Sequence, residues 1–116
     1  MKNSYSVSED VIVKNENGTS HFHDGNCGSW LQHWKNYGGN DKKPCCCIKG
    51  CSKLAEHGAH VTRPKANDDY YKTHLYIVPM CAAHNGMHGE EFTAVEGTVF
   101  VRANQAETCG KKCNKF

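Results

Sequence analysis

Short apolar runs at strand-like spacing, separated by polar turns, make up most of the pattern along this chain. Residues 5–13 alternate between apolar and polar positions, which predicts a strand. The run HLYIVP at 74–79 is the most apolar and predicts a buried strand, and TVFV at 98–101 predicts a last one. We expect this last strand to pair with residues near 92–95 across the Gly-containing turn between them.

One helix and several polar connections complete the expected elements. Ser29 can cap a helix that carries Trp30, Leu31 and Trp34 on one face. Glycines at 38 and 39 end that helix. The polar stretch 63–71 predicts a loop, and 81–89 predicts a tight turn and a short helix. No repeat or linker divides the chain, so we expect residues 1–116 to form a single α+β domain with short antiparallel strands.

The composition predicts a thin hydrophobic core. The chain has 116 residues, of which 38% are hydrophobic, and its mean hydropathy is −0.71. A domain of this size buries a smaller share of its surface than a large one, so it usually needs cross-links or a metal. Eight cysteines and eight histidines are available for that purpose.

The start of the chain favours metal over disulfides. MKNSYSVSED is polar and lacks the apolar segment of a secretory signal. We therefore expect a cytoplasmic protein in a reducing compartment, where clustered Cys and His indicate metal binding. No segment has the roughly 20 apolar residues of a membrane helix, so no membrane role is expected. The net charge of +2 is too low to require a nucleic-acid partner and does not exclude one.

Two close pairs of residues have the spacing of structural zinc ligands. Cys46 or Cys47 pairs with Cys51 on a turn that Gly50 permits, and both spacings fit. Cys81 and His84 follow the apolar run 74–79 with two residues between them. The sequence therefore predicts one zinc ion held by these two pairs, with the choice between Cys46 and Cys47 open.

A second group joins the two ends of the chain. Cys27 and His33, with His21 and His23 nearby, can share a second zinc with Cys109 and Cys113. A Cys27–Cys109 disulfide, or free thiols among unrelated surface histidines, are the alternatives.

Three stretches of the central region follow one another in a recognisable order. They are CCIKGC at 46–51, GAHV at 58–61 and IVPMCAAHNGMH at 77–88. A cysteine knuckle, a histidine-bearing strand, and a strand that ends in a second knuckle and opens a helix resemble the HNH family of treble-clef nucleases. The resemblance covers about residues 46–88. It implies a treble-clef centre, with a two-strand hairpin and a helix around a catalytic divalent metal and a separate structural zinc at the knuckles.

The resemblance also implies catalytic roles. His60 matches the general base that activates water, and His88 matches the distal metal-binding histidine on the helix. The catalytic ion would be Mg²⁺ or Mn²⁺, which polarises the scissile phosphate. Ala59 stands where the family usually has an Asp or His ligand. The alternative donors are His57, Asp68 and Asp69.

Three functions remain from these observations. The first is a non-catalytic, HNH-like zinc domain that contacts nucleic acid or protein. The second is a metal-dependent endonuclease, against which Ala59 argues. The third is a secreted, disulfide-stapled binding protein, against which the polar start of the chain argues. We prefer the first.

Overall fold

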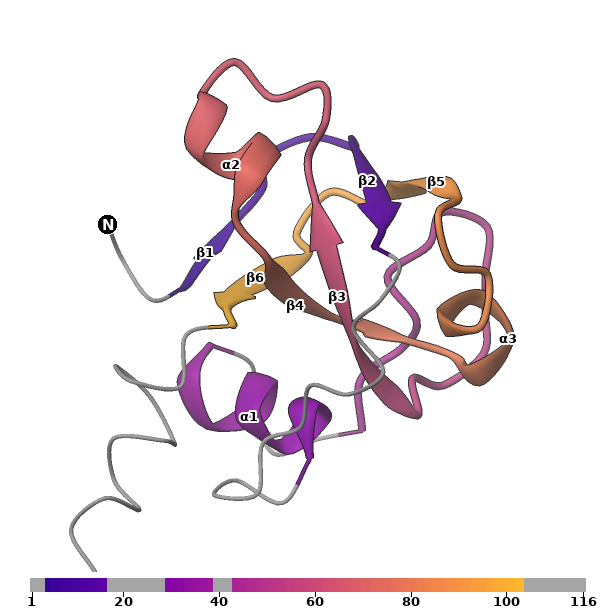
Figure 1. Cartoon of the computed structure of the whole chain (residues 1–116). Coiled ribbons are helices and arrows are strands. Elements are labelled where there is room, and N and C mark those ends of the chain that lie inside the picture. The colour runs from indigo at the N-terminus through magenta and orange to yellow at the C-terminus, as the bar shows by residue number, and fades with distance from the viewer. Residues whose placement is uncertain (1–3, 17–28, 39–42, 104–116) are drawn as a thin grey trace, which may run out of the picture.

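Six strands and three short helices make up the regular structure of the computed structural model, which describes residues 4–16, 29–38 and 43–103 (Figure 1). The strands form one antiparallel sheet in the order β1-β6-β4-β3-β2-β5. The strands are β1 (Ser4–Ser6), β2 (Val11–Asn15), β3 (His57–Thr62), β4 (Tyr76–Met80), β5 (Glu91–Ala94) and β6 (Val99–Arg102). The helices are α1 (Trp30–Tyr37), α2 (Asp69–Thr73) and α3 (Ala82–Asn85). The α+β class expected from the sequence is confirmed.

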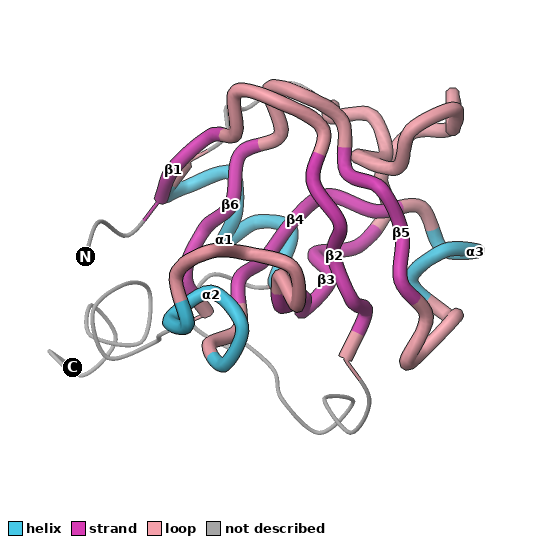
Figure 2. The backbone as a smooth tube through the Cα atoms, turned by 90° about the horizontal axis from the view of Figure 1, so that it is seen from above, coloured by secondary structure: helices cyan, strands magenta, loops and turns pink. Residues whose placement is uncertain are grey.

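The sheet is curled, with β1 and β5 at its two edges. The predicted strand at 5–13 is two strands, β1 and β2, which lie in different halves of the sheet. Between them, the backbone N–H of Val7 donates to the carbonyl of Thr98 at 3.1 Å, and the Val7 carbonyl accepts from Gly97 at 2.9 Å. The β1–β2 and β5–β6 connections therefore run side by side, as Figure 2 shows.

The predicted pairing of the last strand with residues 92–95 is wrong. β6 pairs with β1 and β4, and β5 pairs with β2. The turn between β5 and β6 does form, but the chain on either side of it has other partners. Val95 N–H donates to the Cys47 carbonyl at 2.9 Å and Ala94 bridges to Ile48, so the end of β5 is bonded to the segment before β3.

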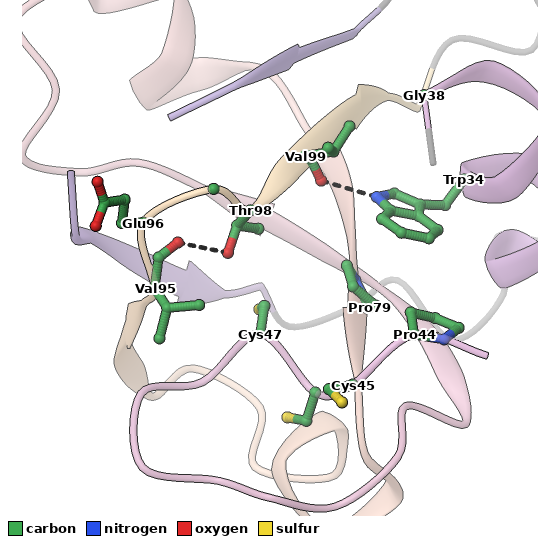
Figure 3. A pocket seen from close by; sticks show the side chains of 12 residues that line it. Trp34, Gly38, Pro44, Cys45, Cys47, Pro79, Val95, Glu96, Thr98 and Val99 are labelled. Atoms are coloured by element: carbon green, nitrogen blue, oxygen red, sulfur yellow. Dashed lines mark hydrogen bonds between the residues drawn. The ribbon is translucent and has the colours of Figure 1, made fainter. Parts of the chain in front are cut away.

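Helix α1 covers the face of the sheet formed by β3, β4 and β6. The predicted Ser29 cap is present, since the Ser29 hydroxyl accepts from Gln32 N–H at 3.1 Å. Trp34 is buried against Ile77 and Val101, and its indole N–H donates to the Val99 carbonyl at 2.8 Å (Figure 3).

Gly58 on β3 sets how closely α1 approaches the sheet. A Cβ at this position would lie 2.5–2.7 Å from backbone atoms of Trp30 and Leu31. Because backbone cannot move aside as a flexible side chain can, only glycine allows this docking.

The other face of the sheet encloses the main core. Its fully buried side chains come from β2, β3, β4 and β6 and include Val13, Val61, Tyr76, Val78 and Phe100. Cys46, Cys47 and Ile48 join this core from a segment that has only isolated bridges.

Helix α2 lies partly where the sequence predicted a loop. It begins after Asp68, whose carboxylate accepts from Tyr70 N–H at 2.9 Å and caps it. Of the helices in the described part of the chain, none is long and apolar enough to cross a membrane.

Candidate metal centre

Three cysteines and one histidine converge between the segment 46–51 and the start of α3. The ligand atoms of Cys46, Cys51, Cys81 and His84 all lie within 4.8 Å of one another. His84 Nδ1 is 3.2 Å from Cys81 Sγ and 3.7 Å from Cys46 Sγ. These residues are the four that the two predicted pairs supply, with Cys46 as the choice at the open position.

The first pair is brought together by a tight loop. Cys51 N–H donates to the Ile48 carbonyl at 3.0 Å, and Gly50 takes a positive φ of 85° that side chains rarely adopt. Cys46 N–H donates to the Lys53 carbonyl at 2.9 Å, which closes the loop behind the ligands. The two thiols therefore face the same point without help from a regular element.

The second pair lies where β4 passes into α3. Cys81 directly follows β4, and its carbonyl accepts from Asn85 N–H at 2.9 Å, so His84 sits on the single turn of α3. The His84 ring packs edge-on against Phe92 of β5, with 5.1 Å between ring centroids. This contact holds the imidazole toward the cysteines.

Burial and hydrogen bonding act in opposite directions on the thiols. Burial raises the pKa of Cys46 to about 11. Burial also raises the pKa of Cys81, but the backbone N–H of His84 and the neighbouring thiols of Cys46 and Cys51 outweigh it and leave that pKa lowered. A metal ligand must be a thiolate, and of these two thiols Cys81 loses its proton the more readily.

The donor set fits a metal ion. Around a tetrahedral zinc with bonds of about 2.0–2.3 Å, neighbouring ligand atoms lie roughly 3.3–3.8 Å apart. The separations of 3.2 and 3.7 Å from His84 Nδ1 to two of the thiols lie close to this range, and all four ligand atoms lie within 4.8 Å of one another. Two of the four residues are buried and two are half-buried. The group can therefore hold a metal without large rearrangement.

Asn15 supports the site and was not singled out from the sequence. Its buried side-chain amide donates to the carbonyls of His84, Asn85 and Met87, at 3.2, 2.9 and 3.1 Å. Its backbone N–H also donates to the Glu90 carbonyl at 2.9 Å. The end of β2 thereby fixes the chain that leaves α3, and a buried asparagine at the end of an apolar strand was the available signal.

Cys47 and Cys45 lie outside the ligand group. Cys47 is buried in the core, where burial raises the pKa of its thiol, and its backbone N–H donates to the Pro79 carbonyl at 2.9 Å. Cys45 is exposed. Both border a cavity of about 380 Å³ between α1, this segment and the β5–β6 turn (Figure 3). The five cysteines in the described ranges are free thiols.

The two histidines that match the nuclease positions, His60 and His88, do not form a common site. His60 lies on β3, is only 6% exposed and packs edge-on against Trp30 at 4.6 Å. Burial, with a contribution from His33, lowers the pKa of His60 to about 4. The expectation that His88 lies on the helix is wrong, because α3 ends at Asn85 and His88 is exposed in the following turn. In the described ranges neither histidine belongs to a group that could hold a metal.

In the described ranges, the alternative donors also do not belong to a group that could hold a metal. His57 is exposed at the start of β3, and the Asp68 carboxylate caps α2. Ala59 is buried in the core on β3. The position at which HNH nucleases usually have a metal ligand is therefore occupied here by a small side chain of the core.

The predicted second zinc site falls mostly outside the described residues. His33 lies on α1 and is fully buried, with its Nε2 2.9 Å from the Arg102 carbonyl. The other predicted members, Cys27, Cys109 and Cys113 with His21 and His23, lie outside the described ranges. That site stays a prediction.

Comparisons with protein-family models, with curated proteins and with solved structures give no significant match to this chain. The HNH resemblance therefore rests on the motifs at 46–51, 58–61 and 77–88 alone.

Proposed function

We propose that the chain is a zinc-stabilised binding module in which Cys46, Cys51, Cys81 and His84 hold one structural Zn²⁺. The observation that supports this most directly is the convergence of four nitrogen and sulfur donors from two separate segments. Zinc is favoured among metals by a Cys3His set, because soft thiolate ligands select it over Mg²⁺ or Ca²⁺.

We further propose that the centre of the domain is a degenerate HNH-like treble clef. In support, a first knuckle at 46–51 precedes the β3–β4 hairpin, and a second knuckle at Cys81 and His84 opens α3. The hairpin register, with His60 opposite Ile77, places His60 in the middle of β3. Its ring lies against Trp30 of α1, on the side that the helix covers.

The module is proposed to be non-catalytic. A general base must reach the water that it activates, within hydrogen-bond distance of a bound substrate. The buried His60 and the exposed His88 offer no such arrangement with a shared ion. The role that remains is contact with nucleic acid or protein by a domain held together by its metal.

Native mass spectrometry of the full chain tests the metal assignment. We expect at least one zinc per chain in the parent and one fewer in Cys81→Ser. If Cys81→Ser keeps the full metal content, the proposed site is wrong. Deletion of residues 108–116 tests the predicted second site in the same measurement, because it should release one further ion if that site exists.

A nuclease assay tests the absence of catalysis. The zinc-loaded parent should leave plasmid and single-stranded DNA and RNA intact with Mg²⁺ or Mn²⁺. Robust cleavage by the parent that is abolished in His60→Ala would restore the endonuclease function.

A further inference from the structure

Arg63 lies in an unusual environment outside the metal centre. Its guanidinium carbon is 5.3 Å from the ring centroid of Tyr71, 5.9 Å from that of Tyr5 and 6.0 Å from that of Phe100. Its backbone is fixed on both sides, since Arg63 N–H donates to the Tyr71 carbonyl at 2.8 Å and its carbonyl accepts from Ala66 at 3.1 Å. The side chain is therefore held in place before any ligand arrives.

The hydrogen-bond donors of this guanidinium are largely unused. One nitrogen, Nη1, donates to the Tyr5 hydroxyl at 3.3 Å, while the buried Nε has no acceptor. The ion pairs within the described ranges join Lys49 to Asp10 and Lys72 to Asp69, and neither involves Arg63. Aromatic faces attract the positive charge but supply no oxygen for the in-plane N–H groups. Because Nε is shielded from solvent, a ligand that supplies oxygens would meet the remaining N–H groups of Nη1 and Nη2.

A cavity beside Arg63 has the lining that such a ligand needs. Its volume is about 220 Å³, and Arg63, Tyr5 and Tyr71 form one wall. The end of β1 and the bend that follows it also line the cavity, with the exposed Ser6 and Ser8. Hydroxyls can donate hydrogen bonds to an anion, whereas the carboxylate of Glu9, an exposed residue that also lines the cavity, opposes one. The space suits a small oxyanion rather than a whole drug-sized molecule.

We propose that this cavity binds a phosphate group of single-stranded nucleic acid, with Arg63 as its principal ligand. The inference deepens the proposed binding role and rests on it, while using no residue of the metal centre. Arginine donates to phosphate oxygens as a fork, and such contacts are shorter and stronger than neutral hydrogen bonds.

One feature beside the cavity favours nucleic acid over a carboxylate ligand. Next to Tyr71, the Tyr70 and His74 rings are stacked at 3.7 Å with an angle of 8°, and His74 is exposed. Proteins that bind single strands without sequence preference commonly stack the bases on aromatic side chains beside positive charges that contact the phosphates.

Fluorescence anisotropy with a labelled ten-nucleotide single strand tests the proposal on the zinc-loaded full chain. The parent should bind, and more weakly at higher salt. Arg63→Gln should weaken binding about tenfold or more, because a charged hydrogen bond is lost. Lys43→Gln removes the same charge from an exposed position elsewhere and should change affinity by about twofold or less.

Two further variants separate a binding defect from a folding defect. Arg63→Lys keeps the charge but loses the fork, so its affinity should fall between those of the parent and Arg63→Gln. Glu9→Gln removes a negative charge from the cavity and should strengthen binding. Metal content and melting temperature are measured for every variant. A variant that loses oligonucleotide binding but retains zinc has a defect in this cavity. A variant that loses zinc has a defect in the metal centre.

Three outcomes would overturn the proposal. The first is a zinc-loaded parent that does not bind the strand. The second is an Arg63→Gln protein, folded by its melting curve, that binds as Lys43→Gln does. The third is tighter binding of inorganic phosphate or of a phosphoserine peptide than of the single strand, which would assign the cavity to a different phosphate source.

Discussion

Three consecutive cysteines show how much one residue position matters in the first knuckle. Both Cys46 and Cys47 have an acceptable spacing to Cys51, so spacing could not choose between them. The choice follows from neighbouring residues of an extended segment pointing to opposite sides. Backbone hydrogen bonds of Cys47 with Pro79 and Val95 fix the segment. Both thiols are buried in the core, but only that of Cys46 lies within reach of Cys81 and His84. Those partners are distant in sequence, and no local pattern reveals them.

Serine substitutions at these two positions should have different consequences. Cys46→Ser removes a thiolate that a hydroxyl does not replace, so the chain should lose its zinc. Cys47→Ser should retain the zinc and lose about 1–3 kcal/mol of stability, because a hydroxyl is buried in the core. Native mass spectrometry and thermal melts compare the two. Equal metal loss in both variants would contradict the assignment of Cys46.

Buried His60 should remain neutral well below the usual histidine pKa. Burial disfavours its charged form and lowers its pKa from 6.5 to about 4. The unfolded chain therefore takes up this proton at a higher pH than the folded chain does. The stabilising contribution is complete above about pH 6.5 and is lost as the pH falls toward 4. An NMR titration of the His60 ring measures this directly, and a midpoint near 6.5 would show that the ring is not buried.

At the scale of elements, local signals succeeded and long-range pairing did not. The cap at Ser29, the apolar run of β4 and the short helix after Cys81 were all readable from neighbouring residues. The partners of β6 were not, because β1 comes from the other end of the chain and competes with the nearby β5. The extent of α3 also depends on a distant residue, since Asn15 binds the carbonyls at and beyond its end.

Asn15→Ala should loosen the end of α3 and weaken metal binding. The three carbonyls that now share its amide would lose a buried donor, at a cost of about 1–3 kcal/mol. His84 would then be held less firmly, so zinc affinity should fall in a competition assay with a chelator. Asn15→Asp has the same shape, but it places a carboxylate oxygen against the three carbonyl oxygens. It should therefore lower zinc affinity at least as much as Asn15→Ala does. Lys14→Ala, on the other side of β2, should have little effect.

At the scale of the whole molecule, the proposed metal ligands and the sheet share one core. Cys46, Cys47, Ile48 and Cys81 belong to the same core as the strands. The segment 43–56 has no helix or strand of its own beyond isolated bridges. Its side chains therefore reach the core only because the loop is held in shape. The metal proposed at Cys46 and Cys51 would supply that hold, and the predicted thin core is the reason to expect one.

Removal of the metal should unfold the domain rather than release one loop. Structural zinc contributes on the order of 10 kcal/mol of apparent binding free energy, and a domain of this size has a total stability of roughly 5–15 kcal/mol. Circular dichroism and hydrogen exchange before and after chelation measure the change. Zn²⁺ should restore the structure, and Mg²⁺ should not, because thiolate ligands bind it poorly. A chelated chain that keeps its strands, its amide protection and its melting temperature would show that the sheet folds without the metal. The Cys3His group would then be a site added to a stable fold and not the reason for that fold.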